Sequence, residues 1–296
     1  MIDARPGPAS DAEVGAFTAG LGLPGIIDIH VHFMPGPMQQ AVWRHFDSLP
    51  RPWPITYRGD DQARVATLRE LGVRRYTTLS YAHKPRMAEW LNDYSLAFAQ
   101  SHQAVIPSFT FFPEDGAAEY VGRALDAGGR VAKVHLQVSK FDPLDRQLLG
   151  VWERLAAARS PIVIHAGAVP DGSGGEEWCG MGPVRRLLER YPDLLLVLAH
   201  LGAPDYEDAV RLAIDFPQMR VDTAMTLVDR TGFNFPDALM SWLADSPGRV
   251  LFGSDFPTIP HDYAAQVRGL AVRGFGDDWM RRVLWHNAAE LLGVEA

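Results

Sequence analysis

The chain has 296 residues, of which 47% are hydrophobic and 22% charged, and its formal net charge is −8. This composition argues against disorder, and an acidic balance with no Lys/Arg run longer than two argues against binding to nucleic acid or to an anionic membrane. The single cysteine, Cys179, excludes an intrachain disulfide and a cysteine-based zinc cluster, and the absence of a long apolar run or a signal-peptide core predicts a cytoplasmic protein.

The first 25 residues are rich in Gly, Pro and Ala and are expected to form an N-terminal arm with some helix. After this arm, short β-like segments alternate with helical segments along residues 26–296. Eight strands are predicted, at Ile26–His32, Arg75–Tyr81, Val105–Phe112, Val131–Gln137, Pro161–Ala166, Leu194–His200, Arg220–Ala224 and Val250–Asp255.

Helical patterns fill most of the gaps between these strands. Acidic residues before an apolar periodic run mark helix starts, and glycines such as Gly72 and Gly128 mark helix ends. The predicted helices are Asp61–Leu71, Pro85–His102, Glu114–Ala127, Asp145–Arg159, Gly182–Tyr191, Pro204–Phe216, Pro236–Asp245, His261–Val272 and Asp278–Leu292.

The alternation of eight strands with helices predicts the α/β class, as a single-domain (β/α)8 TIM barrel. Several strands, such as VLFGSD and LLLVLAH, are apolar almost throughout, which is typical of parallel strands covered by helices. The sequence contains no GxGxxG or GxxxxGKS fingerprint, which disfavours a Rossmann or P-loop protein.

The segment between His32 and Asp60 is too long for an ordinary connection between a strand and a helix. It contains five prolines and two tryptophans. We interpret it as a long loop that follows the first strand and covers the mouth of the barrel as a lid or pocket wall, with a surface excursion of no functional role as the alternative.

The first strand ends in Asp28-Ile29-His30-Val31-His32. Side chains two positions apart in a strand point to the same face, so His30 and His32 can offer two imidazoles to one cation. Neutral imidazole is a good ligand for zinc and similar divalent ions. A pair of buried, hydrogen-bonded histidines is the alternative.

Three further polar residues follow apolar strands: His165 in PIVIHAG, His200 in LLLVLAHLG and Asp255 in VLFGSDFP. The carboxyl ends of barrel strands meet at one mouth, where the active sites of such barrels lie. Four histidines and one aspartate at four strand ends favour a metal site over a purely structural role.

This set of motifs resembles the amidohydrolase superfamily, and within it the amidohydrolase-2 branch that is similar to the aminocarboxymuconate-semialdehyde decarboxylases. The matching segments are IDIHVH with Pro35 three residues on, IVIHAG, LAHLG, LFGSDFP and HNAAELLG. The resemblance implies one divalent metal ion, usually zinc, with manganese or another divalent ion as an alternative. It implies that His30, His32, His165 and Asp255 are the metal ligands and that His200 is a catalytic group beside them.

The expected chemistry follows from such a site. An ion held by imidazoles and a carboxylate lowers the pKa of a bound water, and Asp255 can accept a proton from that water. His200 can orient the water, polarise a substrate oxygen or transfer the proton. A second metal ion would need a bridging ligand, such as a carbamylated lysine on the fourth strand, and is not expected.

On the fourth strand, Lys133, His135 and Gln137 are expected to share one face. Lys133 can be such a bridge, can pair with a carboxylate such as Asp28 or Asp255, or can bind a substrate carboxylate. His135 either faces substrate or is a hydrogen-bonded wall residue. Candidate substrate-binding or supporting residues of lower weight are Tyr81, His83 and Trp178, and either Asp222 or Thr223 faces inward on the seventh strand.

The sequence therefore predicts a metal-dependent hydrolase, in which metal-activated water attacks an ester, lactone or amide-like bond of a small molecule. The first alternative is a metal-dependent decarboxylase, a non-hydrolytic lyase acting on a small carboxylic acid, and the second is a barrel that binds a metal or ligand without turnover. A homodimer is expected from the resemblance alone. The substrate lies beyond what the motifs specify.

Overall fold

The computed structural model describes residues 6–51, 53–169, 174–228 and 235–294. The chain divides into two compact units: the first joins the two ends of the chain, Met1–Tyr76 and Asp222–Ala296, and the second is Thr77–Val221. Within the described part of the chain, the helices are too short and too polar to cross a bilayer.

The second unit contains a sheet in which neighbouring strands are parallel and follow one another in chain order, β4-β5-β6-β7-β8. Each strand is short and buried, as expected for parallel strands that are covered on both faces. The strands of this unit are β3 (Val105–Ile106), β4 (Ser108–Thr110), β5 (Val131–His135), β6 (Ile162–His165), β7 (Leu196–Leu198) and β8 (Arg220–Asp222), whose last residue begins the second part of the first unit.

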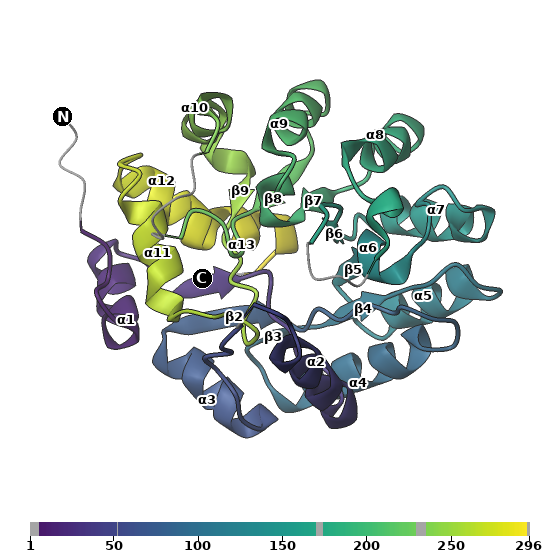
Figure 1. Ribbon diagram of the computed structural model, residues 1–296, viewed down its shortest axis with the longest axis horizontal. Helices are drawn as coiled ribbons and strands as arrows, with labels where there is room; N and C mark the ends of the chain where they lie inside the picture. Colours follow the sequence, from purple (N-terminus) through teal and green to yellow (C-terminus); the bar gives the residue numbers. More distant parts are fainter. Residues whose placement is uncertain (1–5, 52, 170–173, 229–234, 295–296) are drawn as a thin grey trace. The chain divides into compact units, whose positions relative to one another are not determined.

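The longer helices of the second unit lie along the outer side of these strands (Figure 1). They bury one apolar face each, for example Val184, Leu187 and Leu188 in α8. Their bounds are α4 (Ala88–Ser101), α5 (Ala117–Asp126), α6 (Leu136–Ser139), α7 (Leu149–Ala157), α8 (Met181–Arg190) and α9 (Tyr206–Asp215), with short 3-10 turns at η1 (Arg146–Leu148), η2 (Glu176–Trp178) and η3 (Ala199–Gly202).

The first unit holds β1 (Ile26–Asp28), which pairs in parallel with β2 (Val73–Thr77) up to Tyr76. Its helices include α1 (Asp11–Gly20), which packs against α11 (Tyr263–Ala271). The remaining elements are α2 (Gly36–Asp47), α3 (Asp61–Glu70), α10 (Asp237–Asp245), η4 (Pro247–Arg249), β9 (Val250–Leu251), α12 (Asp277–Arg281), the π turn η5 (Arg282–His286) and α13 (Asn287–Leu292).

The predicted strands and helices are present, but several boundaries are wrong. The third predicted strand is divided into β3 and β4 at Pro107, which has no N–H to donate to a ladder. The fourth ends at His135, because α6 begins at Leu136, so the prediction that Gln137 shares a strand face with Lys133 is wrong. The helix predicted from Pro85 begins at Ala88, since Arg86 has a left-handed φ of 63°.

The predicted helix signals at α3 are confirmed. The Asp60 side chain caps the helix by accepting a hydrogen bond of 2.8 Å from the Ala63 N–H. The chain leaves the helix through Gly72, whose φ of 79° suits a residue without a Cβ. Local capping chemistry therefore determines where this helix begins and ends.

The long segment after β1 contains a helix that the sequence analysis did not predict, α2. The end of the segment is fastened to the loop that follows β9: Trp53 Nε1 donates to the Thr258 carbonyl (3.0 Å) and the Thr56 N–H donates to the Ile259 carbonyl (2.9 Å). The ring of Tyr57 packs on that of Phe256, with centroids 5.0 Å apart. The segment is thus attached to residues that directly follow Asp255.

Gly167, two residues after β6, allows a close backbone approach within the second unit. A Cβ at Gly167 would lie 1.6 Å from the Ala203 carbonyl oxygen. We expect Gly167→Ala to lower the free energy of unfolding by more than about 2 kcal/mol, since backbone on both sides must move. The matched control is Gly182→Ala in α8, where the new methyl would meet only an Arg186 side-chain nitrogen at 3.9 Å.

Urea unfolding of both variants checks this prediction. The control is expected to be neutral or slightly stabilising, as is usual for Gly→Ala in a helix. Equal stability of Gly167→Ala and wild type would show that the Ala203 loop can move aside without cost.

Candidate metal centre

The backbone of the first unit brings His30, His32 and Asp255 together. The segment after β1 runs parallel to the segment after β9, with a bridge between Val31 and Phe256. The Asp255 N–H donates to the His30 carbonyl (2.8 Å), and the His32 N–H donates to the Phe256 carbonyl (2.7 Å). Regular strand geometry ends at Asp28, yet these bonds continue the ladder through both histidines.

The three side chains offer nitrogen and oxygen atoms to a common point. The Asp255 Oδ1 atom lies 2.7 Å from His32 Nε2 and 3.5 Å from His30 Nε2. The three ligand atoms all lie within 4.8 Å of one another. Both imidazoles are buried, and 24% of the Asp255 side chain is exposed, so the group is accessible through its carboxylate. A divalent ion that prefers nitrogen and oxygen ligands fits this donor set.

Gly253 makes room for the group. A Cβ at this position would lie 2.7 Å from His30 Cβ and 3.4 Å from Asp222 Cβ. Any side chain here would displace the imidazole, because a contact below 3.0 Å cannot be kept. The glycine of the LFGSDFP motif therefore sets the distance between β9 and His30.

His30 has a second acidic partner, Asp222, at the end of β8. His30 Nδ1 lies 2.9 Å from Asp222 Oδ2, and both side chains are buried. The sequence placed Asp222 on a strand but carried no signal for this contact, because the two residues are 192 positions apart.

Asp28 anchors the segment that carries His30 and His32. Its Oδ1 accepts hydrogen bonds of 3.1 Å from the N–H groups of His30 and Ser254, and its Oδ2 accepts one of 2.8 Å from the Tyr263 hydroxyl. Burial raises the pKa of Asp28 to about 7, and the hydrogen bonds from Ser254, His30 and Tyr263 oppose that rise. The carboxyl links the strands to α11.

Asp255 and His200 share an unusual backbone feature. Both have left-handed φ angles, 68° and 55°, and Leu201 beside His200 has 54°. Such conformations are costly in residues with a side chain, and they occur where a particular side-chain direction is required. The feature is not confined to them, since Met225 and Leu227 in the first unit and Lys140 in the second also have positive φ.

The second unit brings His165 together with two other histidines. His165 ends β6, and its Cα is the register partner of His135 on β5. This register stacks the two rings, with centroids 3.8 Å apart and an interplanar angle of 12°. The His200 ring meets His165 edge-on at 4.7 Å, and the Tyr81 ring lies 5.0 Å from His135.

The other predicted residues of this unit have simpler surroundings. Lys133 is buried on β5, two positions before His135, so both point to the same face. His83 is exposed, and its pKa is lowered by partial burial and by the neighbouring Lys84. Trp178 is half-buried in η2. Burial and nearby acids raise the pKa of the Cys179 thiol to about 11, which argues against a nucleophile.

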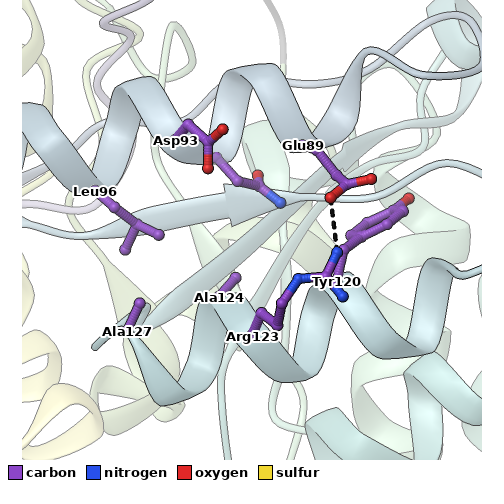
Figure 2. Close-up of a pocket in the computed structure, with 8 residues that line it drawn as sticks. Glu89, Asp93, Leu96, Tyr120, Arg123, Ala124 and Ala127 are labelled. Atoms are coloured by element: carbon purple, nitrogen blue, oxygen red, sulfur yellow. Dashed lines mark hydrogen bonds and ion pairs between the residues drawn. The ribbon is translucent and has the colours of Figure 1, made fainter.

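A hollow between α4 and α5 is lined by the apolar residues Leu96, Ala124 and Ala127 and by polar residues, most of which have structural partners (Figure 2). Arg123 pairs with Glu89 at 2.7 Å, and Asn92 exchanges two hydrogen bonds with the Thr110 backbone. The Tyr120 hydroxyl accepts from the Phe112 N–H at 2.9 Å. These groups hold the helices together, and none of the predicted site residues lines this hollow.

The closing HNAAELLG segment supports β9. Asn287 Nδ2 donates to the carbonyls of Pro247 and Val250, at 2.6 and 2.7 Å, at the start of the strand that leads to Asp255. This motif residue therefore has a structural role within the first unit.

Solved structures define the class of fold. An uncharacterised TIM-barrel protein from Bordetella bronchiseptica matches with a TM-score of 0.68 and 17% identity, over 91% of this chain and 98% of that one. The chain thus has the (β/α)8 barrel fold, as predicted.

The family follows from the sequence itself. A family model described as amidohydrolase matches residues 27–294, so the chain belongs to the amidohydrolase family. A comparison with curated proteins gives no match.

Similar structures include enzymes of two reaction types. A putative 2-pyrone-4,6-dicarboxylic acid hydrolase from Pseudomonas putida has a TM-score of 0.63 and 16% identity, with 92% of this chain and 99% of that chain covered. A 5-carboxyvanillate decarboxylase from Novosphingobium aromaticivorans, in complex with manganese, has a TM-score of 0.65 and 14% identity, with 91% and 96% covered. The fold is therefore shared by hydrolases and decarboxylases.

Removal of the Tyr263 hydroxyl tests whether its hydrogen bond to Asp28 stabilises the segment that carries the histidines. We expect Tyr263→Phe to lower the free energy of unfolding by about 1–3 kcal/mol, because Asp28 loses a buried hydrogen bond while the ring keeps its packing on Phe252. Chemical unfolding measures the change. A variant as stable as wild type would mean that this bond contributes nothing to anchoring β1.

Proposed function

We propose that the protein is a metal-dependent hydrolase that uses an activated water to attack an ester, lactone or amide-like bond of a small molecule. The observation that carries the proposal is the convergence of His30 Nε2, His32 Nε2 and Asp255 Oδ1 in a buried, partly accessible group. Membership in the amidohydrolase family supports it.

The residues that would hold the ion are His30, His32, Asp255 and His165. The first three are supported by their mutual distances within one unit. His165 is proposed on its position at the end of β6 and on the resemblance of IVIHAG to the family motif. We propose one ion, zinc; the manganese in the similar decarboxylase supports manganese as the alternative.

A divalent ion in this donor set would lower the pKa of a water and polarise a substrate oxygen. We propose that Asp255 accepts the proton of the attacking water through its carboxylate, which is the most accessible member of the group. His200 is proposed to hydrogen-bond the substrate oxygen and to pass the proton taken up by Asp255 on to the leaving group. The left-handed backbone at both residues is consistent with directed side chains.

A decarboxylase is the alternative, and one observation favours it. Lys133 is buried on the same face of β5 as His135. Lys133 already has an interaction within the protein, and its positive charge would in addition attract a substrate carboxylate. The hydrolase is preferred because its proton transfers need only Asp255 and His200, which the family motifs supply.

Chelation tests the metal requirement. We expect the purified protein to hydrolyse members of an ester and lactone panel, to lose at least 100-fold in kcat/KM after chelation, and to recover on addition of zinc or manganese. His30→Ala and Asp255→Ala should not recover, because each removes a ligand. Release of CO2 from a panel of aromatic carboxylates, without hydrolysis, would instead support the decarboxylase. Full activity in metal-free protein would refute both.

His200 and His165 test the division of roles. We expect His200→Ala to keep its bound metal and to lose about 10²–10⁴-fold in kcat, as is usual for a general acid–base group. His165→Ala should lose the metal itself. Metal content measured by mass spectrometry separates the two, and equal loss of metal in both variants would show that the assigned roles are wrong.

A further inference from the structure

Asp222 contacts His30 through the ring nitrogen that does not face Asp255. Its Oδ2 lies 2.9 Å from His30 Nδ1, whereas His30 Nε2 is the atom that faces Asp255. The two nitrogens of this imidazole therefore have different neighbours: one meets Asp222 and the other meets the ligand group.

The Asp222 carboxylate is itself fixed in place. Its second oxygen, Oδ1, accepts a hydrogen bond of 3.0 Å from the Ala224 N–H. The Asp222 side chain is fully buried. The lack of a side chain at Gly253 leaves room for Asp222 and His30 to lie side by side. A carboxylate held in this way presents an acceptor to His30 Nδ1 in one orientation.

An ionised carboxylate can only accept hydrogen bonds, so the proton of this contact belongs to His30 Nδ1. A neutral imidazole with its proton on Nδ1 has its lone pair on Nε2. A carboxylate partner also increases the basicity of the ligating nitrogen. With its proton on Nδ1, His30 therefore has a free lone pair on Nε2 for a metal ion even when no ion is bound.

We propose that Asp222 is a positioning residue that keeps the proton of His30 on Nδ1 and directs the Nε2 lone pair toward the metal. The inference rests on the proposed function, because the orientation of the His30 imidazole matters only if Nε2 binds a metal ion. It adds a residue that the ligand set of the family motifs does not include.

Asp222→Asn is the most informative variant, because it keeps the shape of the side chain and replaces one acceptor oxygen with an NH2 donor. Asparagine has a single oxygen, and the Ala224 N–H needs that oxygen because a backbone amide cannot release its proton. The amide nitrogen then faces His30 Nδ1 and donates to it. This arrangement forces the imidazole proton onto Nε2, the atom required by the ion.

The proton position can be measured without metal. Ring ¹⁵N–¹H correlation spectra of histidine-labelled, metal-free protein report which nitrogen carries a proton, and His30→Gln identifies the His30 signals. We expect a proton on Nδ1 in wild type and on Nε2 alone in Asp222→Asn. An unprotonated Nδ1 in wild type would overturn the inference whatever the variant does.

Metal affinity is the second readout. Competition with a chelator should show zinc binding weakened about 10–100-fold in Asp222→Asn, with thermal unfolding of the metal-free proteins as a check on folding. The matched control is Thr226→Val, a nearby buried residue whose hydroxyl donates to the Thr223 carbonyl at 2.9 Å, which should bind zinc like wild type. Equal affinities of Asp222→Asn and wild type, or an equal loss in the control, would overturn the inference. Wild type that binds no ion would refute the proposed function instead, and the spectra alone would then decide the proton position.

Discussion

The close approach of the segments that follow β1 and β9 is the constraint on which the candidate site depends. Backbone hydrogen bonds between Asp255 and His30 and between His32 and Phe256 fix the distance between a histidine pair and a carboxylate. Gly253 permits this distance, since a methyl group there would overlap with His30. The ligand geometry is thus determined by backbone pairing, and the side chains need little freedom to meet.

Much of this arrangement could be predicted from the sequence, because it depends on short-range patterns. Apolar runs ending in a polar residue correctly located β6, which ends at His165, and the start of β9, although β9 ends at Leu251 and not at Asp255 as predicted. The two-residue spacing of His30 and His32 predicted that both imidazoles would point to the same side, and in the structure both lie close to the Asp255 carboxylate. Strand period and strand ends carry this information locally.

Other features could not be predicted, because they arise from tertiary contacts or from departures from regular geometry. The contact of Asp222 with His30 joins residues far apart in sequence, and no local pattern specifies it. Periodicity assumed that β5 continues past His135, but the chain turns into α6 there. The left-handed backbone at His200 could not be predicted, because the position is not a glycine. The stacking of His135 on His165 follows from strand register, which a single sequence does not give.

The attachment of the long segment after β1 has a consequence for engineering and for divergence within the family. Trp53, Thr56 and Tyr57 are bound to the stretch immediately beyond Asp255, whereas α2 lies earlier in the same segment. Replacing this segment with a foreign loop therefore leaves these contacts intact only when the graft stops before Trp53. A graft that extended through Tyr57 would also remove the contacts that support the stretch after Asp255, so the segment and this support could not be varied independently.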